Sequence, residues 1–181
     1  GGFGNFYETN LENEINMMET NITALHILTK FCLKNMRNNN YGYILNVSSI
    51  ASFEPGPLMA TYYATKAYVT SLSRAISKEL QKEKSKVQVS VLCPGPVDTN
   101  FNNVAGVKFS IKPISSEYVA KYAIDRLLKR KRTIIPGKIS KCLHLMAKIA
   151  PSNLAMEVAY YNQKRKIKEL SEEIEQTRMK V

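Results

Sequence analysis

The segment GYILNVSS, residues 42–49, decides how this chain folds. It is a short apolar run that follows the turn-forming asparagines at 38–40, and such a run is typical of a buried strand. A second run of this kind, VQVSVL at 87–92, comes after a stretch, 60–84, whose apolar residues recur with helical period. Two buried strands separated by a helix predict a βαβ unit, in which the strands are parallel and both sheet faces are covered.

The same alternation extends along the chain in both directions. Apolar residues at three- and four-residue steps predict helices over 11–38 and 115–130, the second with Ser116 as its N-cap, and a short strand follows at 133–135. Two more helical segments flank residues 151–153. The sequence therefore predicts an α/β fold with a parallel sheet, whose ligand site should lie beyond the carboxyl ends of the strands.

Composition limits the classes of protein to consider. The 181 residues are 44% hydrophobic, with 8 Gly and 7 Pro, which is typical of a globular domain and excludes a collagen-like or low-complexity chain. Three cysteines without a CxxC pair favour neither a disulfide framework nor a zinc site. We therefore expect no metal site and a reducing compartment, the cytoplasm, and we interpret His26 and His144 as ordinary helix residues.

Positive charge is concentrated in the last third of the chain. Residues 1–120 carry 11 basic and 9 acidic side chains, residues 121–181 carry 15 and 6, and the net charge is +11. Such a tail suits phosphate groups of a ligand, a lipid or a nucleic acid, although charge alone favours a solvated helical face. Segment 138–150 places Ile139, Cys142, Leu143, Met146 and Ile149 at helical steps, with lysines elsewhere. It is predicted to cover a substrate mouth or to lie on a membrane surface.

Tyr62 and Lys66 follow the first strand and form a chemically suggestive pair. Four residues apart on a helix, they lie on one side, one turn apart, and a nearby ammonium is expected to lower the pKa of a phenol. A tyrosine tuned in this way donates or accepts a proton at a carbonyl or hydroxyl oxygen. Taken alone, such a pair is more often a packing tyrosine beside a surface lysine.

Three further features surround this pair. Ser49 precedes Tyr62 by 13 residues, Asn21 lies in the preceding predicted helix, and the loop 94–99 follows the second strand. The motifs NVSS, YYATK and LCPGPVDT, in this order and spacing, resemble the short-chain dehydrogenase/reductase family over about residues 1–137. The resemblance implies a Rossmann-like doubly wound parallel sheet. It also places the glycine-rich phosphate turn of the N-terminal βαβ units upstream of Gly1, because this sequence lacks that turn.

The resemblance implies a role for each matching residue. Tyr62 would be the general acid/base, Lys66 would tune it and bind the cofactor ribose, Ser49 would hold the substrate oxygen, and Asn21 would complete a catalytic tetrad through water. Contacts with the cofactor are further implied for Gly1, Pro94, Gly95, Val97 and Thr99.

Alternatives exist at several positions. Tyr63 competes with Tyr62 but would misalign Ser49, and Ser48 is interpreted as a hydrogen bonder at the strand end. Without the resemblance, Asn21 would be a solvent-facing helix residue and Thr99 a helix cap.

The resemblance implies an oxidoreductase that moves a hydride between NADP or NAD, with NADP favoured, and a carbonyl or secondary alcohol. The sequence after Asp98 resembles the branch of 3-oxoacyl and hydroxysteroid reductases, which implies a ketone or 3-oxoacyl substrate. An acyl chain or steroid-like ketone would contact Val104, Val107, Phe109 and Ile111. Residues 1–137 would be the catalytic part of a dinucleotide-binding domain, and residues 138–181 a basic helical extension and candidate substrate lid.

Partners follow from the same interpretation. A homodimer or homotetramer is expected through the helices at 11–38 and 60–84, because their apolar stripes exceed what one sheet face needs. These stripes comprise Met18, Ile22, Leu25, Leu72, Ile76 and Leu80. We expect no nucleic acid, but peripheral membrane contact by the tail is a second expectation. The alternative function is a basic binding or scaffold protein for a membrane surface or nucleic acid. A catalytically inactive fragment is a further alternative, since the sequence starts at Gly1 without an initiator methionine.

Overall fold

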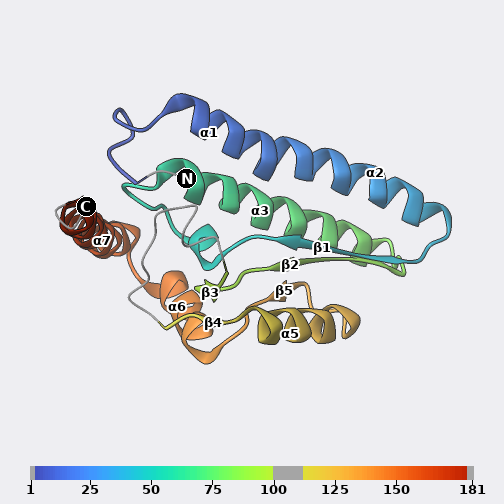
Figure 1. Ribbon diagram of the computed structural model, residues 1–181. Coiled ribbons are helices and arrows are strands. Elements are labelled where there is room, and N and C mark those ends of the chain that lie inside the picture. The colour runs from blue at the N-terminus through green and yellow to red at the C-terminus, as the bar shows by residue number, and fades with distance from the viewer. Residues whose placement is uncertain (1–2, 100–111, 179–181) are drawn as a thin grey trace.

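A three-stranded parallel sheet lies at the centre of the computed structural model, which describes residues 3–99 and 112–178 (Figure 1). The strand order is β1-β2-β5, with β1 at Gly42–Val47, β2 at Val87–Leu92 and β5 at Thr133–Ile134. β1 and β2 pair along their whole length. Two short strands, β3 (Val97–Asp98) and β4 (Ile114–Ser115), form a separate parallel pair.

Helices cover both faces of the sheet (Figure 1). On one face, α1 (Leu11–Met18), the π-helical segment η1 (Glu19–Ala24) and α2 (Leu25–Asn38) form one continuous rod beside α3 (Ala60–Lys82). On the other face lies α5 (Ser116–Leu128). The predicted α/β fold with a covered parallel sheet is confirmed.

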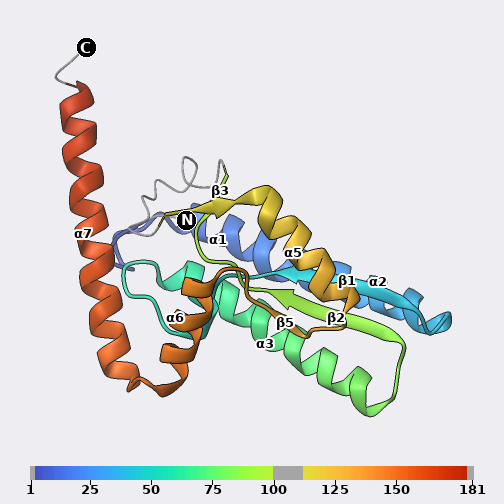
Figure 2. The same ribbon diagram turned by 90° about the horizontal axis from the view of Figure 1, so that it is seen from below.

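The last two helices lie at the end of the molecule toward which β2 points (Figure 2). They are α6 (Lys138–Ile149) and α7 (Ser152–Arg178). A short 3₁₀ helix, η2 (Ile50–Phe53), follows β1 and packs against α6. The C-terminal segment therefore reaches the sheet end where the sequence predicts the site.

The core is built around β2. All six of its residues are buried, including the polar Gln88 and Ser90, whose side chains are hydrogen-bonded to each other. Val91 packs with Val69 of α3 on one face, and Leu92 packs with Val119 and Leu127 of α5 on the other. Because successive side chains point to opposite faces of the sheet, β2 packs against the helices on both sides.

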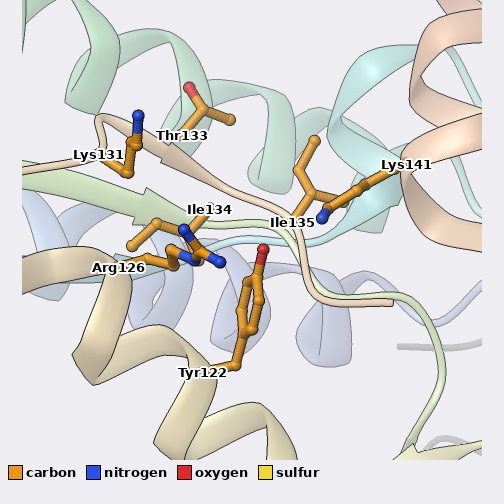
Figure 3. Close-up of a pocket in the computed structure, with 7 residues that line it drawn as sticks. All are labelled: Tyr122, Arg126, Lys131, Thr133, Ile134, Ile135 and Lys141. Carbon is orange, nitrogen blue, oxygen red and sulfur yellow. The ribbon is translucent and has the colours of Figure 1, made fainter. Parts of the chain in front are cut away.

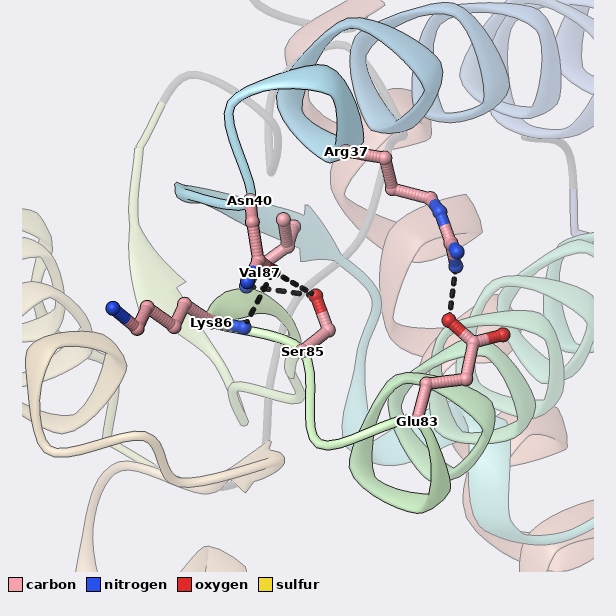
Figure 4. Close-up of polar contacts among 6 residues, drawn as sticks. All are labelled: Arg37, Asn40, Glu83, Ser85, Lys86 and Val87. Carbon is pink, nitrogen blue, oxygen red and sulfur yellow. Dashed lines mark hydrogen bonds and ion pairs between the residues drawn. The ribbon is translucent and has the colours of Figure 1, made fainter.

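A polar network closes the opposite end of the sheet (Figure 4). Asn40 adopts a positive φ of 46°, a conformation that asparagine tolerates better than most residues. Its Oδ1 accepts hydrogen bonds from Ser85 Oγ and the Lys86 N–H, both at 3.0 Å. An ion pair between Arg37 and Glu83 adds a second link between the end of α2 and the turn before β2.

The N-cap of α5 differs from the prediction. Ser115, not Ser116, has extended backbone angles, and its Oγ accepts a hydrogen bond from the Tyr118 N–H at 3.2 Å. Ser116 is already the first helical residue. The prediction of Ser116 as the cap is therefore wrong by one position, because spacing alone does not fix where extended backbone ends.

The predicted apolar stripes also differ in part. Leu80 and Ile76 pack with Val87 and Val89, and Leu25 packs against the cluster of Val69. Leu80 is buried in the core, while Leu25 and Ile76 are half-buried against it. Met18 of the predicted stripe is exposed, and so are other apolar residues of the α1–α2 rod, namely Leu11, Ile15, Ile27, Leu28 and Phe31.

Candidate active site

The loops that follow β1 and β2 lie side by side at one sheet edge. The Ser48 N–H donates to the Leu92 carbonyl at 2.7 Å, and the Ile50 N–H donates to the Pro94 carbonyl at 2.9 Å. These bonds continue the strand pairing beyond the sheet. They hold Ser49 next to the loop 94–99, where parallel sheets bind their ligands.

Ser49 and Tyr62 are hydrogen-bonded to each other. Ser49 is fixed as the N-cap of η2, because its Oγ accepts the Ala51 N–H at 3.1 Å, and Tyr62 lies in the first turn of α3. Burial raises the pKa of Tyr62, and the Ser49 hydrogen bond opposes this shift. The prediction that Lys66 lowers this pKa is wrong for this structure, because burial favours the neutral phenol more strongly.

Lys66 lies one turn further along the same side of α3. Its Nζ is 5.9 Å from the centroid of the Tyr62 ring and donates to the Val47 carbonyl at 3.3 Å. Burial lowers the pKa of this ammonium. The structure thus brings Ser49, Tyr62 and Lys66 together, as the sequence predicts.

Asn21 is tied to α3 from the π-helical segment η1. Its Nδ2 donates to Thr65 Oγ1 at 3.1 Å, and that hydroxyl donates in turn to the Tyr62 carbonyl at 2.8 Å. π-Helical turns inside α-helices often mark functional sites. Asn21 therefore contacts the helix that carries Tyr62 and Lys66, unlike a residue that faces only solvent.

The two competing residues have other contacts. Ser48 Oγ donates to the Lys66 carbonyl and accepts from Thr70 Oγ1, both at 2.8 Å, so its predicted role at the strand end is confirmed. The Tyr63 hydroxyl accepts a hydrogen bond from Gln163 Nε2 of α7 at 3.0 Å. Its ring lies against Gly56, where a Cβ would overlap the ring. Tyr63 is thus held by α7 and the loop before α3.

The loop 94–99 is held on two sides. A Cβ at Gly95 would lie 2.5 Å from Ser140 Oγ of α6, so a side chain there would require the Ser140 hydroxyl to move. The Pro96 carbonyl accepts the Ile114 N–H at 3.0 Å, and Val97 pairs with Ile114. Gly1 and the four apolar residues expected at the substrate lie outside the described residues.

A family model described as short chain dehydrogenase matches residues 1–107, more than half of the sequence. The chain belongs to the short-chain dehydrogenase family. Its fold is shared with a solved short-chain dehydrogenase from Sphingobium yanoikuyae in complex with NADPH, at a TM-score of 0.69 and 24% identity over 76% of this chain and 54% of that one. The Rossmann-like fold implied by the motifs is therefore confirmed.

Curated relatives of this dehydrogenase family match over shorter stretches. The inactive 2-(S)-hydroxypropyl-CoM dehydrogenase 2 of Xanthobacter autotrophicus is 31% identical over 126 residues, which are 69% of this chain and 54% of the relative. The mouse 17-beta-hydroxysteroid dehydrogenase type 3 is 37% identical over 94 residues, 52% of this chain and 30% of the relative. The chain thus spans about half, or less, of the length of these relatives.

Three residues that hold the elements around the candidate site were not predicted. Besides Thr65 and Gln163, the buried Glu14 accepts hydrogen bonds from Thr9 Oγ1 at 2.8 Å and from Thr61 Oγ1 at 2.9 Å, and so joins α1 to the residue before Tyr62. A signal for Glu14 exists in the sequence, since it falls on the helical stripe of Met18 and Leu25. No such signal exists for Gln163, whose partner is 100 residues away.

In residues 3–99 and 112–178, no group of three or more His, Cys, Asp or Glu side chains is placed to hold a metal ion. None of the helices in these two ranges is both long and apolar enough to cross a membrane.

Proposed function

We propose that the whole protein is an NAD(P)-dependent oxidoreductase that reduces a ketone or 3-oxoacyl-type carbonyl to a secondary alcohol. The observation that carries this proposal is the hydrogen bond between Ser49 and Tyr62, with the Lys66 ammonium one helical turn away. Similarity to a hydroxysteroid dehydrogenase supports a carbonyl or alcohol substrate.

The residues at the sheet edge fit a nicotinamide cofactor. One N–H of the Lys66 ammonium bonds the Val47 carbonyl, which leaves donors for the hydroxyls of a ribose. The loop 94–99 is fixed beside Ser49 and would lie against the nicotinamide. Its residues implied in this contact are Pro94, Gly95, Val97 and Thr99. We propose NADP, with NAD as the alternative; the NADPH complex of the Sphingobium enzyme and the NAD complex of a Burkholderia phymatum short-chain dehydrogenase support a nicotinamide cofactor of either kind. The bound cofactor would supply the hydride.

The chain's own residues handle the proton. The Tyr62 phenol is protonated at neutral pH, and burial, which raises its pKa, favours this proton-donating form. Ser49 Oγ would donate a hydrogen bond to the carbonyl oxygen and orient it toward Tyr62. As the carbonyl π bond breaks, the Tyr62 proton passes to that oxygen and leaves a phenolate. Asn21 would position α3 through Thr65.

Replacement of Tyr62 tests the proposal. Tyr62→Phe in the whole protein should lower kcat/KM for NADPH-dependent reduction by about 10²- to 10⁴-fold, because it removes the proton donor and keeps the ring. The matched control is Tyr63→Phe, which removes the neighbouring hydroxyl and should reduce activity far less. A panel of steroid ketones and 3-oxoacyl thioesters, followed by NADPH absorbance, provides the measurement.

Two results would overturn the proposal. The first is a Tyr62→Phe protein that keeps most of its turnover. The second is an equal loss in both variants while circular dichroism shows that both are folded.

A further inference from the structure

α6 has three chemically different sides. Ser140, His144 and Ala147 share the side that packs on the body of the protein, where Ser140 lies against Gly95 and the His144 ring centroid is 3.9 Å from that of Phe53. Lysines 138, 141 and 148 are exposed. The remaining side is apolar and carries Ile139, Cys142, Leu143, Met146 and Ile149, and the exposed Leu145 lies among the lysines. The helix therefore docks on the protein through its small and polar side.

The apolar side of α6 points away from the rest of the described chain. Ile139 is 59% exposed, Leu143 37%, Met146 58% and Ile149 75%, and Cys142 is exposed as well. α6 itself lies on η2 beside the site, and its predicted role as the cover of a substrate mouth stays a prediction. Single exposed apolar residues are common, but a contiguous set on one helix side marks an interaction surface.

A cationic cavity adjoins α6 on the side of Lys141 (Figure 3). It has a volume of about 260 Å³ and lies between α5, β5 and α6. Arg126 and Lys141 lie 5.0 and 5.4 Å from the centroid of the Tyr122 ring, and the Tyr122 hydroxyl points between them. Lys131 also lines the cavity.

The charge in this cavity is poorly balanced. None of its described lining residues is acidic. The nearest carboxylate to Arg126 Nε is that of Asp125, at 3.5 Å, and Asp125 also binds Lys129 at 2.7 Å. Arg126 Nε is buried and makes no hydrogen bond to the described residues. Cations gathered around one ring repel each other, so an anion between Arg126 and Lys141 would be favourable.

We propose that α6 and this cavity dock the protein on the surface of an anionic phospholipid membrane. The apolar side of α6 enters the boundary between headgroups and acyl chains, its lysines extend toward the headgroups, and a lipid phosphate occupies the cavity between Arg126 and Lys141. With 12 residues, α6 is too short to span a bilayer and lies in its surface.

Charge complementarity favours this occupant over others. α6 has no acidic residue, so a second copy of the chain would bring the same positive charge to this side. Nucleic acid would satisfy the cations but would leave Met146 and Ile149 in water. An anionic lipid surface matches the apolar side and the cations together.

Cosedimentation of the whole protein with vesicles tests the proposal. Vesicles that contain phosphatidylglycerol should retain the protein, pure phosphatidylcholine vesicles should not, and high salt should release it. Met146→Ser with Ile149→Ser, and separately Lys141→Gln with Arg126→Gln, should each weaken retention by about tenfold or more. Ile124→Ser and Lys121→Gln, which alter exposed residues of α5, are the matched controls and should bind as the unmodified protein does.

Three outcomes would overturn the proposal. One is the absence of retention by phosphatidylglycerol vesicles at low salt. Another is equal retention by both kinds of vesicle. The third is a protein that binds inorganic phosphate but no vesicles, where Lys141→Gln with Arg126→Gln abolishes the binding of phosphate.

Discussion

Burial and hydrogen bonding act in opposite directions on Tyr62. Burial disfavours the phenolate and raises the pKa of Tyr62, while the Ser49 hydrogen bond stabilises the phenolate and lowers that pKa. Burial also lowers the pKa of Lys66, since it disfavours the ammonium. Both groups are therefore shifted toward their neutral forms, and for Tyr62 this is the form that donates a proton.

Replacement of Ser49 should move the pH dependence of the reaction. Ser49→Ala removes the hydrogen bond that lowers the pKa of Tyr62, so this pKa rises and the protonated phenol persists to higher pH. The alkaline limb of kcat/KM for carbonyl reduction should move to higher pH, and the rate should fall by about 10²-fold because the substrate oxygen loses a donor. Ser52→Ala in η2 is the control, since Ser52 bonds Thr70 and not Tyr62. If the alkaline limb of the kcat/KM profile did not move in Ser49→Ala, Ser49 would have no effect on the ionisation of Tyr62.

The elements that sequence predicts well are those with long, uniform patterns. β1, β2 and α3 follow directly from apolar runs and helical period, because burial on both faces leaves no other pattern for the strands. The π-helical segment η1 and the pair β3–β4 were not predicted. A π turn only shifts the phase of a helical pattern, and strands of two residues are too short to show alternation.

The same distinction holds within the site. Tyr62 and Lys66 are four residues apart, so helical spacing predicts that they lie together, and the family resemblance adds Ser49 to the pair. Tyr63 and Gln163, in contrast, are 100 residues apart, and they meet only because α7 packs beside α3. No local sequence pattern predicts this contact. The direction of the Tyr62 pKa shift was also missed, because spacing reports the distance to a charge but not the depth of burial.

The start of α5 offers a test of helix capping. Ser115→Ala removes the acceptor for the Tyr118 N–H and should lower the free energy of unfolding by about 1 kcal/mol. Ser116→Ala changes the adjacent helical residue and should have a much smaller effect, since alanine is favourable inside a helix. Urea denaturation of the two variants measures the difference. Equal destabilisation, or a larger effect in Ser116→Ala, would contradict the assignment of the cap.

At the scale of the whole molecule, two of the surfaces that expose apolar residues lie apart from each other. One is the apolar side of α6, at the end toward which β2 points, and the other lies on α2, on the face of the sheet opposite α5 (Figures 1 and 2). The first is surrounded by lysines and suits an anionic surface. The second, formed by Ile27, Leu28 and Phe31, lies on a helix expected to meet a second copy of the chain. Separate surfaces allow both contacts at once.

Association through α2 gives the last prediction. Ile27, Leu28 and Phe31 share one side of the helix, and burial of Phe31, now 65% exposed, would contribute about 1.5–3 kcal/mol per subunit. Light scattering of the whole protein at micromolar concentration should show a dimer or tetramer, and Phe31→Asp should shift it toward the monomer, because the interface would bury an unpaired carboxylate. Tyr41→Asp is the matched control, since Tyr41 is 63% exposed but lies outside α2. A monomeric unmodified protein, or equal dissociation by the two variants, would show that the interface lies elsewhere or does not form. Because Phe31 does not contact the site, the dissociated variant should also report whether one subunit alone can carry out the reduction.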